Sequence, residues 1–206
     1  GNVTVLTGIV FALRRRGKYL MIDLREDTNK QKHLSTIMVH FRMTGKLLYK
    51  DHFEDVAKHT HVRFCLSDTL RELSFLDFND VRRFGKVWLL PPGGESMDPG
   101  FSRLGPEPLS EEWTSADFIA QIKRRPRSTI KSLLLNQEVV AGIGNIYCDE
   151  ALFRAGIHPA RLNETLSKED ALNLQQAVRE VIAEGIGHQG TSFSDYVDGL
   201  GNRGHF

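Results

Sequence analysis

The sequence predicts an α+β fold, in which an antiparallel β domain over roughly the first hundred residues precedes a helical domain. Two observations carry this prediction. The first half holds short runs rich in β-branched and aromatic residues with partial alternation, which is typical of strands. From Ser115 onward, apolar residues recur at helical spacing. Between the halves, residues 90–100 (LPPGGESMDPG) are rich in Pro and Gly and indicate a loop.

Five runs account for the predicted strands, and turn residues separate them. They lie at residues 18–24, 35–43, 61–67, 71–78 and 86–91. Residues 43–46 (MTGK) and 67–70 (SDTL) are hairpin candidates. The pattern fits a sandwich and a barrel equally well.

The helical half divides at its turn residues. One helix begins near Ser115 and ends before Pro126, because proline cannot continue a helix. Ser128 is the expected N-cap of the next helix, and Asn145 is the expected N-cap of the helix after it. Gly156 is the expected left-handed stop of that third helix.

The last long helix is expected over residues 166–186. Ser167 and Asp170 resemble a capping box in which Asp replaces the usual Glu or Gln.

Composition and cysteine usage exclude several classes of protein. With 206 residues and 40% hydrophobic content, the chain can bury a real core. No run approaches the roughly 18 apolar residues of a membrane span, and no secretory pattern opens the chain, so a cytoplasmic location is expected. Cys65 and Cys148 lie too far apart for a Cys-x-x-Cys zinc site or a disulfide framework, and both are expected to be small buried residues.

The basic residues are clustered although the net charge is only +1, from 27 basic and 26 acidic residues. The clusters lie at residues 14–19, 81–86 and 123–131. Any one of them is equally well explained as a solvated face. The three together favour a polyanionic partner.

The stretch Gly142–Asn145 (GIGN) opens a helix and has two interpretations. It could present backbone N–H groups and a short polar side chain to an anion at the helix N-terminus. It could also be an ordinary connection between helices, because Gly and Asn are common turn residues.

Five motifs together resemble the bacterial formamidopyrimidine-DNA glycosylase family, which removes 8-oxoguanine and ring-opened purines from DNA. They are RRGKYL (15–20), HFRMTGKL (40–47), DVRRFG (80–85), LGPEPLS (104–110) and VVAGIGNIYCDEALFRAGIHP (139–159). The related endonuclease-eight class shares the last motif but is not expected to carry both the Met-x-Gly turn and the Arg-x-Phe-Gly loop.

The resemblance implies a β-sandwich domain at residues 1–104 and a helix-two-turn-helix DNA-binding domain at 105–206. It implies damaged double-stranded DNA as the partner, a monomer, no membrane, and a nucleoid-associated location in a bacterial cytoplasm.

The resemblance also implies roles for individual residues. Lys18, His40 and Asn145 match residues that contact DNA phosphates. Without the family, Lys18 would be an exposed strand-end lysine and His40 a hydrogen-bonded core histidine.

A second set of residues matches the family's wedge. Met43, Arg82 and Phe84 would enter the gap left by the flipped base, with Arg82 facing the orphaned cytosine; the alternative is that Met43 and Phe84 belong to the core.

The segment 187–206 resembles the loop that closes over the lesion. Thr191, Phe193 and Tyr196 are its candidate residues, and a Gly-rich tail is the alternative.

Two family features are not matched by these residues. The family's nucleophile is an N-terminal proline followed by glutamate, and its C-terminus is a four-cysteine zinc finger. The chain is therefore expected to be an inactive fragment without a catalytic residue or metal site, and zinc is expected in the complete protein. Glu107 and Asp80 are carboxylates that could serve as general acids, but their motifs favour structural roles.

Three functions follow from these residues. The first is a base-excision-repair glycosylase with AP lyase activity. The second is a noncatalytic homologue that binds damaged DNA. The third, an RNA-associated helix-two-turn-helix module, is disfavoured because an RNA clamp would not need a wedge.

Overall fold

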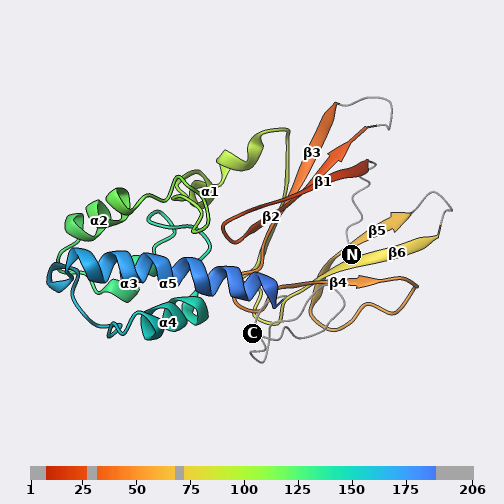
Figure 1. The fold of residues 1–206 in the computed structure, drawn as a ribbon. Coiled ribbons are helices and arrows are strands. Elements are labelled where there is room, and N and C mark those ends of the chain that lie inside the picture. The colour runs from red at the N-terminus through yellow and green to blue at the C-terminus, as the bar shows by residue number, and fades with distance from the viewer. Residues whose placement is uncertain (1–7, 27–31, 68–71, 189–206) are drawn as a thin grey trace. The chain divides into compact units, whose positions relative to one another are not determined.

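Antiparallel strands in two sheets form the first part of the protein (Figure 1). The computed structural model describes residues 8–26, 32–67 and 72–188. The strands are β1 (Ile9–Arg16), β2 (Tyr19–Arg25), β3 (His33–His40), β4 (Lys46–Lys50), β5 (Thr60–Ser67), β6 (Leu73–Asn79) and β7 (Lys86–Leu90). Their order is β1-β2-β3-β7 in one sheet and β4-β6-β5 in the other, which makes this part a sandwich.

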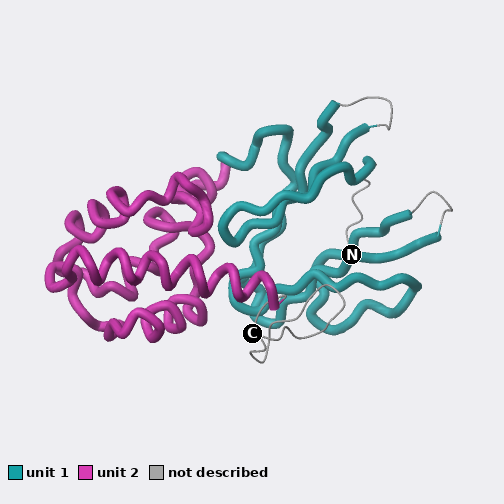
Figure 2. The backbone as a smooth tube through the Cα atoms, viewed as in Figure 1, with its two compact units in different colours: residues 1–96, 189–206 teal, residues 97–188 magenta. Residues whose placement is uncertain are grey.

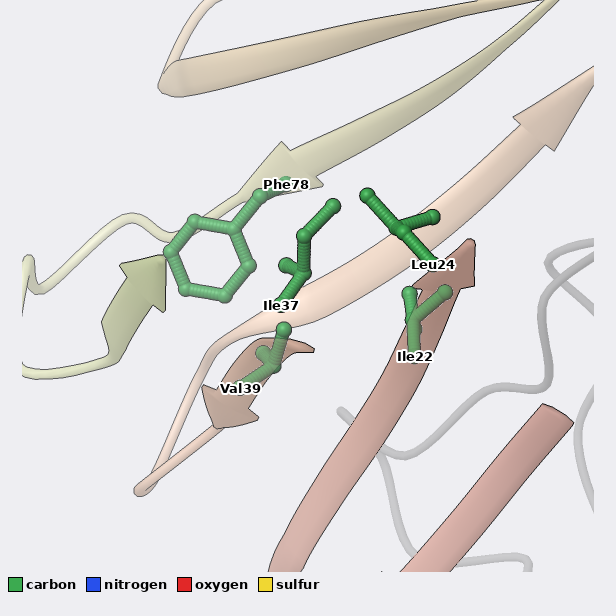
Figure 3. Packing of buried hydrophobic residues seen from close by; sticks show 5 residues of the cluster. All are labelled: Ile22, Leu24, Ile37, Val39 and Phe78. Atoms are coloured by element: carbon green, nitrogen blue, oxygen red, sulfur yellow. The ribbon is translucent and has the colours of Figure 1, made fainter. Parts of the chain in front are cut away.

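The two sheets pack on each other through a small apolar core. Ile22 and Leu24 of β2, with Ile37 and Val39 of β3, meet Phe78 of β6 (Figure 3). All five side chains are buried, and burial of each contributes about 1.5–3 kcal/mol. This core fixes the ends of the strands, from which the candidate site is built.

The opposite face of β2 and β3 is also buried, which explains why alternation in the sequence is only partial. It carries a polar cluster, in which Arg14 Nη2 donates to Asp23 Oδ1 over 2.9 Å and Thr36 Oγ1 donates to the same atom over 2.7 Å. Arg14 also pairs with Glu95. Arg14, from the first basic cluster, is therefore paired with two carboxylates of the protein, although its side chain is 44% exposed.

The turn at residues 43–46 is not a hairpin. Strand β3 ends at His40, whereas β4 pairs with β6 in the other sheet, so the turn carries the chain between sheets. The Gly45 N–H donates to the Phe41 carbonyl over 3.0 Å and closes this crossing. By contrast, β5 and β6 pair antiparallel, as the second predicted hairpin requires; residues 68–70 lie outside the described residues.

The Pro- and Gly-rich segment at 90–100 is not a simple loop. It contains the 3₁₀ turn η1 (Gly94–Met97) and the short helix α1 (Pro99–Ser102). Asp98 Oδ1 accepts from the Gly100 N–H over 2.7 Å, and Pro99 occupies the first turn, where its missing N–H costs nothing.

Helices form the second part, as the sequence predicts. They are α2 (Ser115–Arg124), α3 (Ile130–Leu135), α4 (Asn145–Arg154) and α5 (Lys168–Gly187), with a 3₁₀ turn, η2 (Asn163–Thr165). Figure 2 marks the division of the described chain into a unit ending at Ser96 and a unit of Met97–His188.

Two predicted N-caps are wrong by one residue. Thr129, not Ser128, caps α3, because its Oγ1 accepts from the Ser132 N–H. Gly144, not Asn145, is the N-cap of α4, and Asn145 is the first helical residue. Both pairs of neighbours are plausible caps, and only the backbone conformation decides between them.

The other helix-end predictions are confirmed. Gly156 has a φ of 67°, as expected after α4, and Ser167 forms the capping box with Asp170 before α5. None of the described helices is long and apolar enough to cross a membrane. Cys148 is buried as predicted, but Cys65 is exposed because it lies on the outward face of β5, whereas Val62 and Phe64 on the other face pack against the core.

Candidate nucleic-acid interface

Two loops of the first unit carry the predicted wedge residues. Residues 41–45 follow β3, and residues 80–85 precede β7. Strands β3 and β7 are neighbours, and His40 at the end of β3 pairs with Lys86 at the start of β7. The register therefore brings the two loops together at one end of the larger sheet.

The wedge side chains are exposed. Met43 and Phe84 are each 58% exposed, which excludes the alternative that they belong to the core. Arg82 lies close to Met43, with its Nη1 atom 3.5 Å from the Met43 Sδ atom. An exposed apolar pair beside a guanidinium is suited to entering a base stack, but this role stays a prediction.

A buried carboxylate joins the two loops. Asp80 Oδ1 accepts from Thr44 Oγ1 over 2.5 Å, and its Oδ2 accepts from the Gly85 N–H over 2.8 Å. The Arg82 N–H lies 3.2 Å from Asp80 Oδ1 and 3.3 Å from Thr44 Oγ1. Asp80 is thus structural, as its motif suggested, and the sequence did not indicate its link to Thr44.

Each loop also holds a non-glycine residue in the left-handed region. Arg42 has a φ of 56° and Arg83 a φ of 59°, and each directly precedes an exposed wedge residue. Such a backbone costs about 1–3 kcal/mol and persists only where its surroundings hold it. Gly85 is needed here because a Cβ atom would lie 2.6 Å from Cζ of Phe78.

The predicted phosphate-binding residues of this unit lie near the same sheet end. Lys18 is exposed in the turn between β1 and β2. His40 is only 8% exposed, its ring meets the edge of Tyr19 at 4.6 Å between centroids, and its Nδ1 accepts from the Arg42 N–H over 3.0 Å. His40 therefore has the buried, hydrogen-bonded setting that its residue type alone suggested; its phosphate contact stays a prediction.

Strand register brings two of the basic clusters together. Arg16, Tyr19, His40 and Lys86 form one row across the larger sheet, because each pairs with the next. The clusters at 14–19 and 81–86, far apart in sequence, therefore share one end of the sheet.

In the second unit, the GIGN turn presents the open end of α4. The N-cap Gly144 has no side chain to satisfy the first N–H groups of the helix, and Asn145 is exposed at its first position. Unsatisfied N–H groups and the helix dipole favour an anion at such an end. The geometry is compatible with the predicted phosphate contact of Asn145, which stays a prediction.

The turn is held by Gln137, which sequence analysis missed. Gln137 Oε1 accepts from the Gly142 N–H over 2.9 Å, and its Nε2 donates to the Ile143 carbonyl over 2.9 Å. Gly142 has a φ of 90°, so the turn needs glycine there. A glutamine five residues before a glycine turn gives no distinct sequence signal.

The motif LGPEPLS supports the same turn. The Gly105 N–H donates to the Gln137 carbonyl over 2.8 Å, and the Ala141 N–H donates to the Pro106 carbonyl over 2.9 Å. A Cβ atom on Gly105 would lie 2.4 Å from the Glu138 carbonyl oxygen. These contacts agree with the structural interpretation of the motif that contains Glu107.

The third basic cluster, in the second unit, is partly neutralised. Lys131 pairs with Asp149 at 2.6 Å, whereas Lys123, Arg124 and Arg127 are exposed. The exposed members are the part of this cluster that can offer charge to a partner.

The remaining predicted residues, Thr191, Phe193 and Tyr196, lie outside the described residues. Within the described ranges, no group of three or more His, Cys, Asp or Glu residues could hold a metal ion.

Comparisons with known proteins agree with this division of the chain. Residues 5–87 match the formamidopyrimidine-DNA glycosylase N-terminal domain, and residues 104–198 match the formamidopyrimidine-DNA glycosylase H2TH domain. The formamidopyrimidine-DNA glycosylase of Heliobacterium modesticaldum is 42% identical over 200 residues, which is 96% of this chain and 68% of that protein. The chain belongs to the formamidopyrimidine-DNA glycosylase family.

Other members of the family are similarly close. The formamidopyrimidine-DNA glycosylase of Desulforamulus reducens is 45% identical over 94% of this chain, and the match spans 66% of that relative. The chain thus spans about two thirds of the length of these curated relatives.

Solved structures of the family share the fold. The MutM (Fpg) protein of Thermus thermophilus aligns with a TM-score of 0.80 at 36% identity, over 95% of this chain and 67% of that one. The Lactococcus lactis Fpg in complex with DNA containing an abasic site aligns with a TM-score of 0.81 at 29% identity, over 96% and 67%.

Proposed function

We propose that residues 1–206 form the damage-recognising part of a base-excision-repair glycosylase with AP lyase activity. Its substrates would be oxidised purines, 8-oxoguanine and formamidopyrimidines, in duplex DNA. The observation that carries the proposal is the exposed group of Met43, Arg82 and Phe84, held on two loops by one buried carboxylate. Membership of the family and the DNA complexes of Lactococcus lactis Fpg support it.

The wedge would act after the damaged base leaves the stack. Unpairing and unstacking cost a few kcal/mol, which apolar contacts in the vacated gap can offset. Phe84 and Met43 would supply these contacts. The planar fork of Arg82 would donate to the edge of the orphaned cytosine.

Phosphate contacts would hold the duplex without reading its sequence. Asn145 and the open N-terminus of α4 provide one site, and Lys18 provides a cation in the other unit. We propose that the protein acts as a monomer in a bacterial cytoplasm, associated with the nucleoid.

The covalent chemistry would require residues that this sequence does not supply. In the proposed reaction the secondary amine of an N-terminal proline attacks C1′, and the base departs with the electrons of its glycosidic bond. The C1′–O4′ bond then opens, O4′ takes up a proton, and the resulting iminium ion leads to strand cleavage. The first proline of these residues is Pro91. Zinc is expected in the complete protein, but the described residues contain no group of His, Cys, Asp or Glu side chains that could bind it.

The first test is binding by residues 1–206. Anisotropy with duplexes that carry 8-oxoguanine or guanine opposite cytosine, at matched salt, should show tighter binding to the lesion. Equal binding to both duplexes would contradict the proposed recognition.

The second test uses the product of the complete reading frame. That protein should excise 8-oxoguanine and give a borohydride-trapped protein–DNA band, whereas residues 1–206 should give none. Lesion binding without excision by the folded complete protein would favour a noncatalytic damaged-DNA-binding homologue instead.

A further inference from the structure

We infer that Asp80 is the positioning residue that makes Met43, Arg82 and Phe84 insert into DNA as a single body. The inference rests on the proposed function, since it concerns how the wedge of that site is held. Asp80 itself is fully buried and does not reach the surface where DNA would lie.

The Asp80 carboxylate is shared between the two wedge loops. On one side it accepts from the hydroxyl of Thr44, the residue after Met43. On the other side it accepts from the N–H groups of Arg82 and Gly85, which flank Phe84. One carboxylate thus binds the side chain that follows Met43 and the backbone on both sides of Phe84, including that of Arg82.

The backbone of Asp80 is itself anchored from β5 and the segment before it. The Asp80 N–H donates to the His59 carbonyl over 3.0 Å, and His61 Nε2 donates to the Asp80 carbonyl over 2.8 Å. The carboxylate therefore has a defined position in the sandwich, and the loops take their positions from it.

The carboxylate is also held in its charged form. Burial raises the pKa of Asp80, but the hydrogen bond from Thr44 and those from the N–H groups of Gly85, Arg82 and Arg83 outweigh burial and lower it. Charged acceptors make stronger hydrogen bonds than neutral ones, so this link suits a part that must stay rigid.

Loss of the hydrogen bonds between Asp80 and the two loops should raise the entropic cost of ordering Met43, Arg82 and Phe84 when the base is extruded. The effect should appear only for DNA in which a base must leave the stack. Binding to undamaged duplex relies on phosphate contacts and should change little.

The test compares Asp80→Asn with Thr44→Val and Thr44→Ser in residues 1–206. Asn places an NH₂ group where an acceptor is needed, Val removes the Thr44 hydroxyl at similar volume, and Ser keeps it. The measurements are affinity for duplexes with and without 8-oxoguanine, and the fluorescence of 2-aminopurine beside the lesion, which reports unstacking.

Asp80→Asn and Thr44→Val should each lower the preference for lesion DNA about tenfold or more, the size expected for a hydrogen bond to a charged group. The 2-aminopurine signal should fall with it. Thr44→Ser should keep both the preference for lesion DNA and the 2-aminopurine signal near their wild-type values. The inference would be overturned if Thr44→Val kept the wild-type preference for lesion DNA, or if Thr44→Ser lost as much of it as Thr44→Val. If Asp80→Asn does not fold, the comparison of the two Thr44 variants tests the inference without it.

A double-mutant cycle provides the second readout. If Asp80 acts through the wedge, Asp80→Asn should lower the preference for lesion DNA by a smaller factor once Phe84→Ala is present, because only Met43 and Arg82 are then left to position; full additivity would overturn the inference. A wild-type chain without any preference for lesion DNA would contradict the proposed function instead, so the two failures are distinguishable.

Discussion

The Nη1 atom of Arg82 lies 3.5 Å from the Sδ atom of Met43, although the two residues are 39 positions apart. The pair joins a hydrogen-bonding fork to an apolar side chain at the ends of neighbouring strands. Phe84, on the same loop as Arg82, is as exposed as Met43.

Phe84→Ala and Arg82→Ala should reduce the preference for lesion DNA opposite cytosine. For Arg82 the loss should be about 1–3 kcal/mol if its fork reads base edges. Affinity for undamaged duplex should fall much less, as measured by anisotropy. Leu73→Ala is the matched control, because Leu73 is 59% exposed on β6, outside both loops. Equal losses on damaged and undamaged duplexes would make the wedge residues ordinary surface contacts.

Lys18→Ala should weaken binding to damaged and undamaged duplex about equally. A lysine on a phosphate releases about one counterion, so the slope of log K against log salt should decrease by roughly one. Lys58→Ala removes the same charge from another exposed position of the first unit and serves as the control. An unchanged slope in Lys18→Ala would remove Lys18 from the DNA surface.

Gln137→Leu should weaken DNA binding through the GIGN turn. The substitution removes the acceptor of the Gly142 N–H and the donor to the Ile143 carbonyl, each of which contributes about 0.5–1.5 kcal/mol. Because the effect acts through the phosphate site, it should not add to that of Asn145→Ala. Independent, additive losses in the double variant would show that Gln137 does not act through the phosphate site of Asn145.

The Arg14 cluster should make stability depend on pH. The hydrogen bond from Arg14 lowers the pKa of Asp23 from 3.8, and Arg14 also lowers the pKa of Glu95 from 4.5 against the effect of burial. A lowered folded-state pKa contributes stability that is present above the unfolded value and is lost as pH falls through the folded value.

Arg14→Met should therefore destabilise the protein at pH 7 by about 1–3 kcal/mol, the cost of leaving buried acceptors unsatisfied, with solvent access to Arg14 favouring the lower end. The difference from wild type should shrink below about pH 4, where the unfolded carboxyls are protonated. Urea unfolding of both proteins at several pH values measures this difference in the free energy of unfolding. A constant difference from pH 7 to pH 3 would contradict this account.

The residue types in short stretches of the sequence were sufficient to predict most of the strands and helices. Runs of β-branched and aromatic residues located five strands, and Gly156 and the Ser167 capping box marked helix ends correctly. Strands β1 and β4 were missed. Strand β1 contains three arginines and is mostly exposed at a sheet edge, so it has no buried alternation to detect.

The motifs also named the wedge and phosphate residues, but through a family resemblance rather than through spacing. Among the residues that support them, Asp80 was expected from its motif to be structural, whereas Thr44 and Gln137 had no signal in the sequence. Their roles depend on hydrogen bonds to backbone groups, which local sequence does not encode.

Neighbouring residues were enough to predict the order of the β and helical halves, the left-handed stop at Gly156 and the Ser167 capping box. The N-caps of α3 and α4 were each predicted one residue away from their positions. Strand pairing across the sandwich, by contrast, is what makes the turn at 43–46 cross between sheets and meet the loop at 80–85. Strand register sets that meeting, through the pairing of His40 with Lys86. Register depends on packing of one sheet on the other, which no short stretch of sequence contains.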